Sequence, residues 1–324
     1  MRSIFKFLCF FSVVLTIFSS CGPAGIKTIE GNDSISGKLI VFHAGSLSVP
    51  MKALADSFKI RHPGIILQTE STGSLTSIRK ITDLKRDCDI LASADAIMID
   101  KMMIPEFATW NLHFAVNEMA LVYQEQSNLA EEIDNSNWLE IINRKDVIIG
   151  RADPSTDPCG YRTVLTLKLA EKAGFSSVKA ENILAKDIKY IRPKEVDLLA
   201  LLETNTVDYI FLYKSVALQH KLPFIELSDS INLKEPSLND WYSTVSVEVP
   251  GNSPDEKIIR QGEAMVYGIT IPVTSTNPKA AETFIKFIID EGARIIAACQ
   301  QTPYDPPVLS SISSAPKWLN EKLQ

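Results

Sequence analysis

The stretch Lys38–Ile60, KLIVFHAGSLSVPMKALADSFKI, joins an apolar run to a segment of helical periodicity through a turn rich in glycine and serine. The run KLIVF predicts a buried strand. The apolar positions that follow recur at the spacing of one helix face: Leu47, Met51, Leu54 and Phe58. The stretch therefore predicts a strand and a helix joined by the turn HAGSLS.

The same order of strand and helix repeats along most of the chain. Further strands are predicted at PGIILQTE, CDILAS, FAVNEMALVYQE, DVIIGRAD, KYIRPKEV, VDYIFLY and AMVYGITIP. Helices are predicted between and after them, at LTSIRKITDLKR, ADAIMIDKMM, CGYRTVLTLKLAEKAG, DLLALLETNT, KSVALQHK and KAAETFIKFIIDEG. This alternation favours an α/β fold with parallel strands and crossovers on the faces of the sheet.

The length of 324 residues is enough for two such domains. We expect a first lobe at 38–118 and 265–324 and a second lobe at 119–264, with a ligand cleft between them that closes by a hinge.

The composition limits what the chain binds. It is 45% hydrophobic and 22% charged, and its formal net charge is -6. Proteins that bind nucleic acids or anionic membranes normally carry a basic face, so we expect no nucleic-acid partner. An anionic ligand must instead be held by local dipoles.

The N-terminal residues 1–21 have the layout of a secretory signal. Two basic residues precede the apolar run Phe7–Phe18, which is short for a membrane span, and small residues lead to Cys21. The letters FSSC resemble a bacterial lipobox, so we predict lipidation of Cys21 and a flexible tether at 22–37. The protein would then lie in the periplasm or cell envelope, anchored to the membrane by lipid; the alternative is an unlipidated signal peptide.

Three cysteines remain outside the signal: Cys88, Cys159 and Cys299. Their odd number and wide spacing indicate neither a disulfide framework nor a zinc site, and we expect buried thiols. The chain also lacks a dinucleotide fingerprint, a phosphate-binding loop, a nucleophile elbow and a paired-histidine motif. No cofactor is expected.

Two turns of similar composition follow the first two predicted strands, HAGSLS and STGSLTS. Ligands of parallel α/β sheets bind beyond the carboxyl ends of the strands, where free helix amides welcome an anion. Gly45 and Gly73 would let the backbone approach such a ligand, and hydroxyl groups follow them: Ser46, Ser48, Ser74 and Ser77. Helix capping by serine explains each turn equally well.

The segment DPSTDPCGYR, which begins at Asp153, offers a third helix start. Asp157 and Pro158 are typical of a helix N-cap and first helical residue, and Gly174 marks the end of that helix. Capping alone accounts for the pattern. The helix would also direct its amides into the cleft from the second lobe, where a carboxylate tolerates an anion if it is protonated, hydrogen-bonded or coordinated to the ligand's metal centre.

A catalytic reading rests on the neighbouring letters of His43 and Ser46 with an unspecified aspartate. Such a triad would make the protein a secreted hydrolase. Two nearby residues and an aspartate of unknown position are weak support for it, and we expect the protein not to be an enzyme.

Several long motifs together are similar to the molybdate/tungstate-binding protein of ABC transporters, in its tungstate-selective branch. They are FHAGSLSVP, TGSLTSIRKITDL, DILASADAIMIDKMMIPEFATW, DPCGYR, IRPKEVDLLALLE and YKSVALQH. The resemblance covers about Lys38 to Gly292. It implies a type II periplasmic-binding-protein fold with two α/β lobes, and delivery of a tungstate or molybdate oxyanion to a membrane permease by a protein that acts as a monomer.

The resemblance also implies roles for individual residues. Ser46 and Ser74 match the donors of the first lobe, and Asp157 matches a carboxylate that coordinates the metal of the oxyanion. The amides of Cys159 and Gly160 would contact the ligand, and the hydroxyl of Tyr213 could add a donor.

This branch places a second coordinating glutamate where the chain has Leu212. Glu203 and Asp208 lie nearby in the sequence but do not match that position. The expected ligand is therefore four-coordinate, or five-coordinate through Asp157 alone. Sulfate or phosphate remains an alternative ligand, although phosphate carries a proton that requires an acceptor.

Overall fold

The computed structural model describes residues 35–250, 256–310 and 315–323. The predicted signal at 1–21, the lipidation site Cys21 and the tether up to residue 34 lie outside the described residues. Strand β1 begins at Gly37. Among the described residues, no helix has both the length and the apolar character needed to cross a lipid bilayer.

A six-stranded mixed sheet, here called the first sheet, has the order β13-β4-β12-β3-β1-β2. Its strands are β1 (Gly37–His43), β2 (Ile65–Ser71), β3 (Ile90–Ser93), β4 (Leu112–Val116), β12 (Val266–Thr270) and β13 (Thr302–Leu309). Strand β1 runs parallel to β2 and β3, as the alternation of strands and helices predicts. The strands β4, β12 and β13 are antiparallel to their neighbours and bring the end of the chain back to this sheet.

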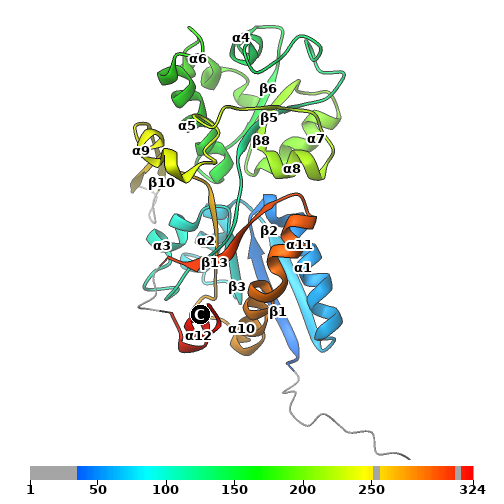
Figure 1. Ribbon diagram of the computed structural model, residues 1–324, viewed down its shortest axis with the longest axis vertical. Helices are drawn as coiled ribbons and strands as arrows, with labels where there is room; N and C mark the ends of the chain where they lie inside the picture. The colour runs from blue at the N-terminus through cyan, green and yellow to red at the C-terminus, as the bar shows by residue number, and fades with distance from the viewer. Residues whose placement is uncertain (1–34, 251–255, 311–314, 324) are drawn as a thin grey trace, which may run out of the picture. The chain divides into compact units, whose positions relative to one another are not determined.

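The helices of the first sheet follow the predicted order. The short 3-10 turn η1 (Gly45–Leu47) leads into α1 (Ser48–Arg61), and α2 (Ser74–Thr82) and α3 (Ala96–Met102) come after β2 and β3. Helix α1 lies beside β2 and against α11 (Ala293–Ala298), as Figure 1 shows. Its buried face includes the four predicted positions except Leu47, which is buried in η1.

A second sheet has the order β7-β6-β8-β5-β9. Its strands are β5 (Met119–Tyr123), β6 (Ile149–Ala152), β7 (Ile191–Arg192), β8 (Tyr209–Tyr213) and β9 (Phe224–Glu226). Its helices are α4 (Trp138–Asn143), α5 (Pro158–Ala173), α6 (Ala180–Ala185), α7 (Leu198–Glu203) and α8 (Lys214–Gln219). Strand β6 runs parallel to β7 and β8, so the loops after these strands open toward the same edge.

The predicted single strand FAVNEMALVYQE is in fact two strands in different sheets. Strand β4 pairs with β12 of the first sheet, and β5 pairs with β8 of the second. Between them the Asn117 side chain accepts a hydrogen bond from the Glu118 amide at 3.0 Å, which replaces a ladder partner. The apolar pattern is continuous through this point, so periodicity alone does not reveal the crossover.

The predicted strand KYIRPKEV is also shorter than expected. Strand β7 has two residues, between the 3-10 turns η2 (Ile188–Tyr190) and η3 (Glu195–Asp197). Pro193 has no amide hydrogen to continue the ladder. The segment therefore turns at its end and brings Glu195 into a buried position.

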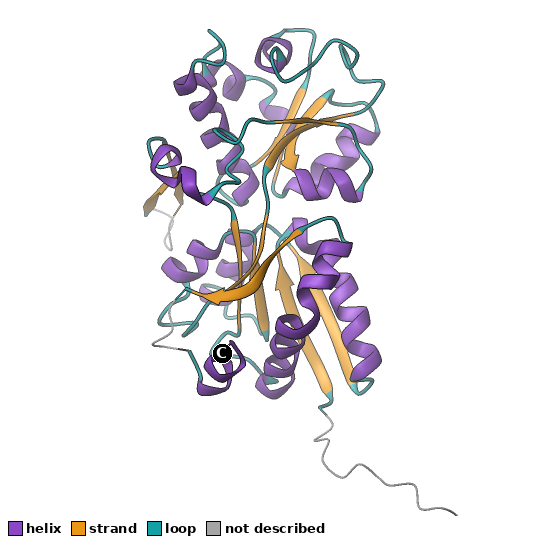
Figure 2. Ribbon diagram, in the orientation of Figure 1, coloured by secondary structure: helices purple, strands orange, loops and turns teal. Residues whose placement is uncertain are grey.

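The rest of the chain forms smaller elements. The polar region after Leu233 contains η4 (Pro236–Leu238), α9 (Asn239–Tyr242) and a hairpin of β10 (Ser246–Pro250) and β11 (Lys257–Gln261). The long C-terminal helix is α10 (Pro278–Phe287), a π-helical turn η5 (Ile288–Gly292) and α11, and α12 (Lys317–Leu323) follows β13. Figure 2 shows the strands of each sheet with helices packed along them.

The three cysteines of the described chain are free thiols. Cys88 and Cys159 are buried as expected, but Cys299 is partly exposed, which corrects the prediction for that residue. It caps the end of α11, where the last turn meets solvent.

Candidate anion-binding site

The turn after β1 places Ser46 in a buried polar network. Its Oγ atom lies 2.9 Å from the hydroxyl of Tyr267, which in turn accepts a hydrogen bond from Asn117 Nδ2 at 2.9 Å. The Ser48 hydroxyl donates to the carbonyl of Gly45 at 2.6 Å. Ser48 thus stabilises the turn but does not cap the helix, since no side chain accepts from the first amides of α1, whereas Ser46 belongs to a network from three segments.

The turn after β2 places Ser74 at the first position of α2, where it is fully buried. Its Oγ atom accepts a hydrogen bond from the Ala94 amide at 2.9 Å. A hydroxyl has one hydrogen to donate, and accepting from an amide leaves that hydrogen for another acceptor. Ser77 Oγ lies 2.5 Å from Thr72 Oγ1, so it stabilises the turn.

Asp157 is the N-cap of α5, as the sequence predicts. Its Oδ1 atom accepts from the Cys159 amide at 2.8 Å, and Pro158 occupies the first turn. The residue is 2% exposed. Gly160 lies against the preceding loop so closely that an added Cβ would be 2.5 Å from the nitrogen of Pro154. The loop is therefore packed tightly around the start of the helix.

Tyr213 ends β8 and is fully buried. Its hydroxyl accepts a hydrogen bond from Arg162 Nη1 at 3.0 Å, and the same nitrogen donates to the Ala94 carbonyl at 2.7 Å. The backbone carbonyl of Ala94 thus accepts a hydrogen bond from Arg162, and its backbone amide donates one to Ser74. These contacts link the loop after β3 to both α2 and α5.

The glycines of the two serine-rich turns bring loops of the two sheets into contact. A Cβ atom on Gly73 would lie 2.3 Å from the carbonyl oxygen of Thr156. A Cβ on Gly45 would lie 2.9 Å from both carboxylate oxygens of Glu195. The loops after β1 and β2 therefore meet the loops before α5 and after β7.

Glu195 is the carboxyl group that the sequence reading missed. Its backbone amide donates to Asp157 Oδ2 at 3.3 Å, and the two side-chain carboxyls also share a hydrogen bond. Its position could be anticipated, since it follows a strand of the second sheet at the edge that carries Asp157. The residues considered from the sequence lie elsewhere: Glu203 is exposed at the end of α7, and Asp208 accepts from the Ile148 amide.

Burial controls the charge of this carboxyl pair. Loss of solvation raises the pKa of Asp157 above its ordinary value, although hydrogen bonds from Glu195 and Cys159 oppose the rise. The pKa of Glu195 is raised well above its ordinary value by burial first and by repulsion from Asp157 second. The pair consequently holds less negative charge at neutral pH than two exposed carboxylates do.

A second buried network, also absent from the sequence predictions, centres on Asp95. This residue caps α3 by accepting from the Ile97 amide at 2.9 Å, and it accepts hydrogen bonds from the Tyr161 hydroxyl and Arg260. Burial opposes ionisation of Asp95, but the charges of Arg260 and Arg162 outweigh it and lower its pKa. The network connects the first sheet to α5 and β11.

The geometry gives less support to a hydrolase triad or to a metal-binding cluster of side chains. His43 Nδ1 bonds to the carbonyl of Ala44 at 2.8 Å, while Ser46 Oγ bonds to Tyr267. Within the described ranges, no group of three or more histidine, cysteine or acidic side chains is arranged to hold a metal ion.

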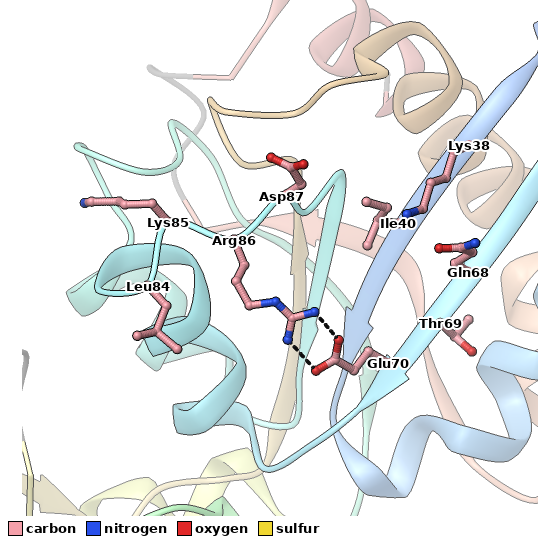
Figure 3. A pocket seen from close by; sticks show the side chains of 9 residues that line it. All are labelled: Lys38, Ile40, Gln68, Thr69, Glu70, Leu84, Lys85, Arg86 and Asp87. Atoms are coloured by element: carbon pink, nitrogen blue, oxygen red, sulfur yellow. Dashed lines mark hydrogen bonds and ion pairs between the residues drawn. The ribbon is translucent and has the colours of Figure 1, made fainter.

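A hollow of about 470 Å³ lies over β1, β2 and the loop after α2 (Figure 3). Arg86 Nη2 pairs there with Glu70 Oε2 at 2.8 Å, and Lys80 pairs with the same carboxylate. The pairing lowers the pKa of Glu70, chiefly through the bond to Arg86. None of the predicted site residues lines this hollow, so it is separate from the network around Asp157.

Comparison with known protein families gives one match over most of the chain. Residues 39–298 match the family described as bacterial extracellular solute-binding protein. A solute-binding protein of Petrotoga mobilis is 42% identical over 330 residues, covering 100% of this chain and 98% of that protein.

Two similar proteins are named for the ligand that they bind. The molybdate/tungstate-binding protein of Pyrococcus abyssi is 39% identical and covers 92% of each chain. The molybdate/tungstate-binding protein of Thermococcus kodakarensis is 37% identical and covers 91% of this chain and 90% of its own.

Solved structures share the fold at low sequence identity. The periplasmic molybdate-binding protein of Azotobacter vinelandii has a TM-score of 0.59 at 15% identity, covering 82% of this chain and 98% of its own. The sulfate-binding protein of Mycobacterium tuberculosis H37Rv has a TM-score of 0.58 at 11% identity, covering 83% and 88%. At these identities the likeness shows the fold, a two-sheet periplasmic binding protein.

Proposed function

Because this chain belongs to the bacterial extracellular solute-binding protein family, we propose that it captures tungstate or molybdate and delivers the oxyanion to the permease of an ABC transporter. The observation that carries the proposal is the pair of relatives named for these ligands, 37% and 39% identical over nine-tenths of the chain. Sulfate is then a weaker ligand, and phosphate is the alternative.

The geometry around Asp157 supports an oxyanion as the ligand. Tungstate and molybdate carry two charges and no proton at neutral pH, so their oxygens accept hydrogen bonds and offer none. The free hydrogen of the Ser74 hydroxyl suits such oxygens, and Ser46 and Tyr213 add hydroxyl groups to the same network. The amides of Cys159 and Gly160 begin α5, where the helix dipole favours an anion.

Asp157 has two roles in this proposal. It caps α5, and it gives an oxygen to the metal centre of the bound oxyanion. A carboxylate beside a dianion is repulsive unless it bonds to that centre or carries a proton. Its position beside the donors therefore favours a metal oxyanion over sulfate.

We also propose that the protein is a carrier without enzymatic activity. Its hydrolase alternative needs Ser46 to be activated by His43, but the bonds of these two side chains go to Tyr267 and Ala44. A general base must lie within hydrogen-bond reach of the nucleophile that it activates.

The proposal also includes the cellular location of the protein. A secreted or envelope location follows from the family, and we propose that Cys21 carries a lipid that holds the protein at the membrane. The first lobe consists of 38–118 and 265–324, and the second lobe is 119–264. The protein acts as a monomer, and its two lobes close on the ligand. Radiolabelled palmitate incorporated into the wild type and absent from Cys21→Ser tests the anchor.

Calorimetric titration tests the ligand assignment. We expect tungstate and molybdate to bind the wild type at least about tenfold more tightly than sulfate, a difference of about 1.4 kcal/mol. Asp157→Asn keeps a residue suited to capping α5 but removes the charge, so it should weaken tungstate binding. Asp134→Asn is the control, because Asp134 caps an exposed turn through Ser136 and Asn137.

Two results would contradict the assignment. One is the absence of binding by both metal oxyanions. The other is phosphate binding that Asp157→Ala abolishes, because that would identify Asp157 as the acceptor of a phosphate proton.

A further inference from the structure

The side chain of Asn117 lies where the chain crosses from the first sheet to the second, and its orientation is fixed. The residue is 6% exposed. Its Oδ1 atom accepts hydrogen bonds from the backbone amides of Glu118 at 3.0 Å and Ser215 at 3.4 Å. A backbone amide donates and cannot accept, so the oxygen of the carboxamide must face these two groups. The nitrogen Nδ2, with its two hydrogens, therefore faces the other way.

The two hydrogens of Nδ2 are directed at two hydroxyl groups. Nδ2 lies 2.8 Å from Ser215 Oγ and 2.9 Å from the hydroxyl oxygen of Tyr267. A carboxamide nitrogen only donates, so both hydroxyl oxygens accept from it. Ser215 lies in α8, beside the second sheet, and Tyr267 lies in β12 of the first sheet. The position of Asn117 thus depends on both halves of the fold.

The hydrogen bond between Tyr267 and Ser46 takes its direction from Asn117. The two hydroxyl oxygens are 2.9 Å apart, a distance compatible with either group as the donor. Within the described chain, the partners of the Tyr267 hydroxyl are Asn117 and Ser46. If Ser46 were the donor, the phenolic hydrogen of this fully buried residue would face only Nδ2, which cannot accept it, and a buried donor without a partner is destabilising. The Tyr267 hydroxyl therefore accepts from Asn117 and donates to Ser46.

Ser46 is then left with one hydrogen that it can donate. The residue is 1% exposed, and in the part of the chain that the structure describes its hydroxyl has no hydrogen-bond partner besides Tyr267. Ser46 is also one of the residues proposed to bind the oxyanion. Tungstate and molybdate offer only acceptors at neutral pH, whereas hydrogen phosphate also carries a proton that requires an acceptor. A serine fixed as a donor suits the metal oxyanions and gives the proton of hydrogen phosphate no acceptor at this position.

We propose that Asn117 is a positioning residue that fixes the Ser46 hydroxyl as a donor, and that it thereby favours oxyanions without a proton over hydrogen phosphate. The inference rests on the proposed function and deepens it, because it assigns part of the selectivity to a residue that acts through other protein groups. Donation runs from Asn117 through Tyr267 to Ser46 and from there to the ligand. Each hydroxyl in this order accepts one hydrogen bond and donates one.

Selectivity between tungstate and phosphate, measured by competition calorimetry on the full chain, tests this role. Asn117→Asp keeps the size of the side chain and the oxygen that faces the amides of Glu118 and Ser215. Its second oxygen accepts hydrogens where Nδ2 donates them. Tyr267 would then donate to the carboxylate and accept from Ser46, which would present lone pairs to the ligand. We expect the tungstate-to-phosphate affinity ratio to fall at least about tenfold, with measurable phosphate binding.

The matched control is Asn239→Asp, the same substitution at an exposed residue of α9. The Oδ1 atom of Asn239 likewise accepts from a backbone amide, that of Ala264, at 2.8 Å. Its bonds do not lead to Ser46. We expect Asn239→Asp to keep the tungstate-to-phosphate ratio of the wild type, because tungstate and hydrogen phosphate carry the same charge and an added carboxylate repels both.

Two more variants separate the direction of the bond from other effects. Asn117→Ala removes the donor without adding a charge, so it should also lower the ratio, although less than Asn117→Asp. Tyr267→Phe interrupts the connection between Asn117 and Ser46. In that background, Asn117→Asp should change the ratio by no more than about twofold, the range within which independent effects add.

The outcomes distinguish this role from a merely structural one and from the proposed function. A structural role would weaken tungstate and phosphate together, so a wild-type ratio in both Asn117→Asp and Asn117→Ala would overturn the inference alone. So would a fall in the ratio that persists undiminished in the Tyr267→Phe background. Failure of the wild type to bind either metal oxyanion overturns the proposed function and this inference with it.

Discussion

Replacing Gly73 with alanine should block closure of the site without unfolding the protein. The backbone at Gly73 has φ -59° and ψ 142°, which alanine adopts readily. The new Cβ atom would nevertheless lie 2.3 Å from the carbonyl oxygen of Thr156 and 3.2 Å from that of Pro193. The substitution therefore acts through the distance between two loops and not through local strain.

The size of the effect follows from that distance. Ordinary contacts of a Cβ atom begin at 3.4 Å, so the Thr156 loop must move away by about 3.4 minus 2.3, or 1.1 Å. The clashing atoms belong to backbone, and no side-chain rotation relieves them. In catalysis a misplacement of about 1 Å in a preorganised site costs about a hundredfold in rate; on the same scale we expect tungstate affinity to fall by about a hundredfold, or about 2.7 kcal/mol.

Calorimetry and thermal unfolding together test this reasoning. We expect Gly73→Ala to lose affinity while its unfolding temperature without ligand stays close to that of the wild type. Gly174→Ala is the control with the opposite pattern, because Gly174 has φ +72° at the end of α5 and no atom lies within 4 Å of an added Cβ. It should lose about 1–2 kcal/mol of stability and keep its affinity. Wild-type affinity in Gly73→Ala would refute the argument.

Two further predictions concern the network around Asp95. Asp95→Asn keeps a capping residue for α3 but removes the buried carboxylate that pairs with Arg260, both side chains being 4% exposed, and leaves Arg260 only the more exposed Glu263 at 3.2 Å. The free energy of unfolding should therefore fall by about 3–5 kcal/mol in denaturant titration, and a loss below about 1 kcal/mol, as for exposed pairs, would contradict the prediction. Burial first, and then the charge of Asp95, raises the pKa of Glu263 from 4.5 to about 7. Glu263 therefore loses its proton less readily in the folded protein than in the unfolded chain, and the free energy of unfolding falls as the pH rises from 4.5 through 7. Glu263→Gln should therefore gain stability relative to the wild type more at pH 8 than at pH 5, and an equal difference at both pH values would argue against this coupling.

The sequence predicts those elements whose local signals agree with their burial. Helix α5 is an example, since Asp157, Pro158 and Gly174 mark both of its ends and the structure has the cap, the first turn and the left-handed C-cap there. The parallel run of β1, β2 and β3 follows from the alternation of strands and helices. The ends of α5 are decided by interactions within a few residues, and the strands pair over longer distances but in the order that the connecting helices impose.

The crossover at Asn117 shows why other features could not be predicted. Its amide nitrogen donates to Ser215 and Tyr267, which are 98 and 150 residues away. Those contacts separate β4 from β5, yet the apolar pattern of the segment shows no interruption. The end of β4 and the start of β5 are therefore set by long-range side-chain contacts, whereas the periodicity of the sequence predicts one continuous strand there.

The role of Gly45 and Gly73 also differs between the sequence prediction and the structure. In the sequence, Gly45 and Gly73 suggest a close approach of backbone to a ligand. In the structure, the space beside them is filled by Glu195 and by the Thr156 carbonyl from the other sheet's loops. Their small size is thus used for contact between the two halves of the site.

This arrangement has a consequence for release as well as capture. Ser46 and Ser74 come from loops of the first sheet, while Asp157 and Glu195 come from loops associated with the second. Neither set alone combines the two serine hydroxyls with both carboxyls, so affinity depends on the contact of Gly73 with Thr156 and of Gly45 with Glu195. A permease that draws these loops apart would separate the serine donors from the carboxyls at once. It could then lower the affinity by movement alone, without competing for any single bond to the oxyanion.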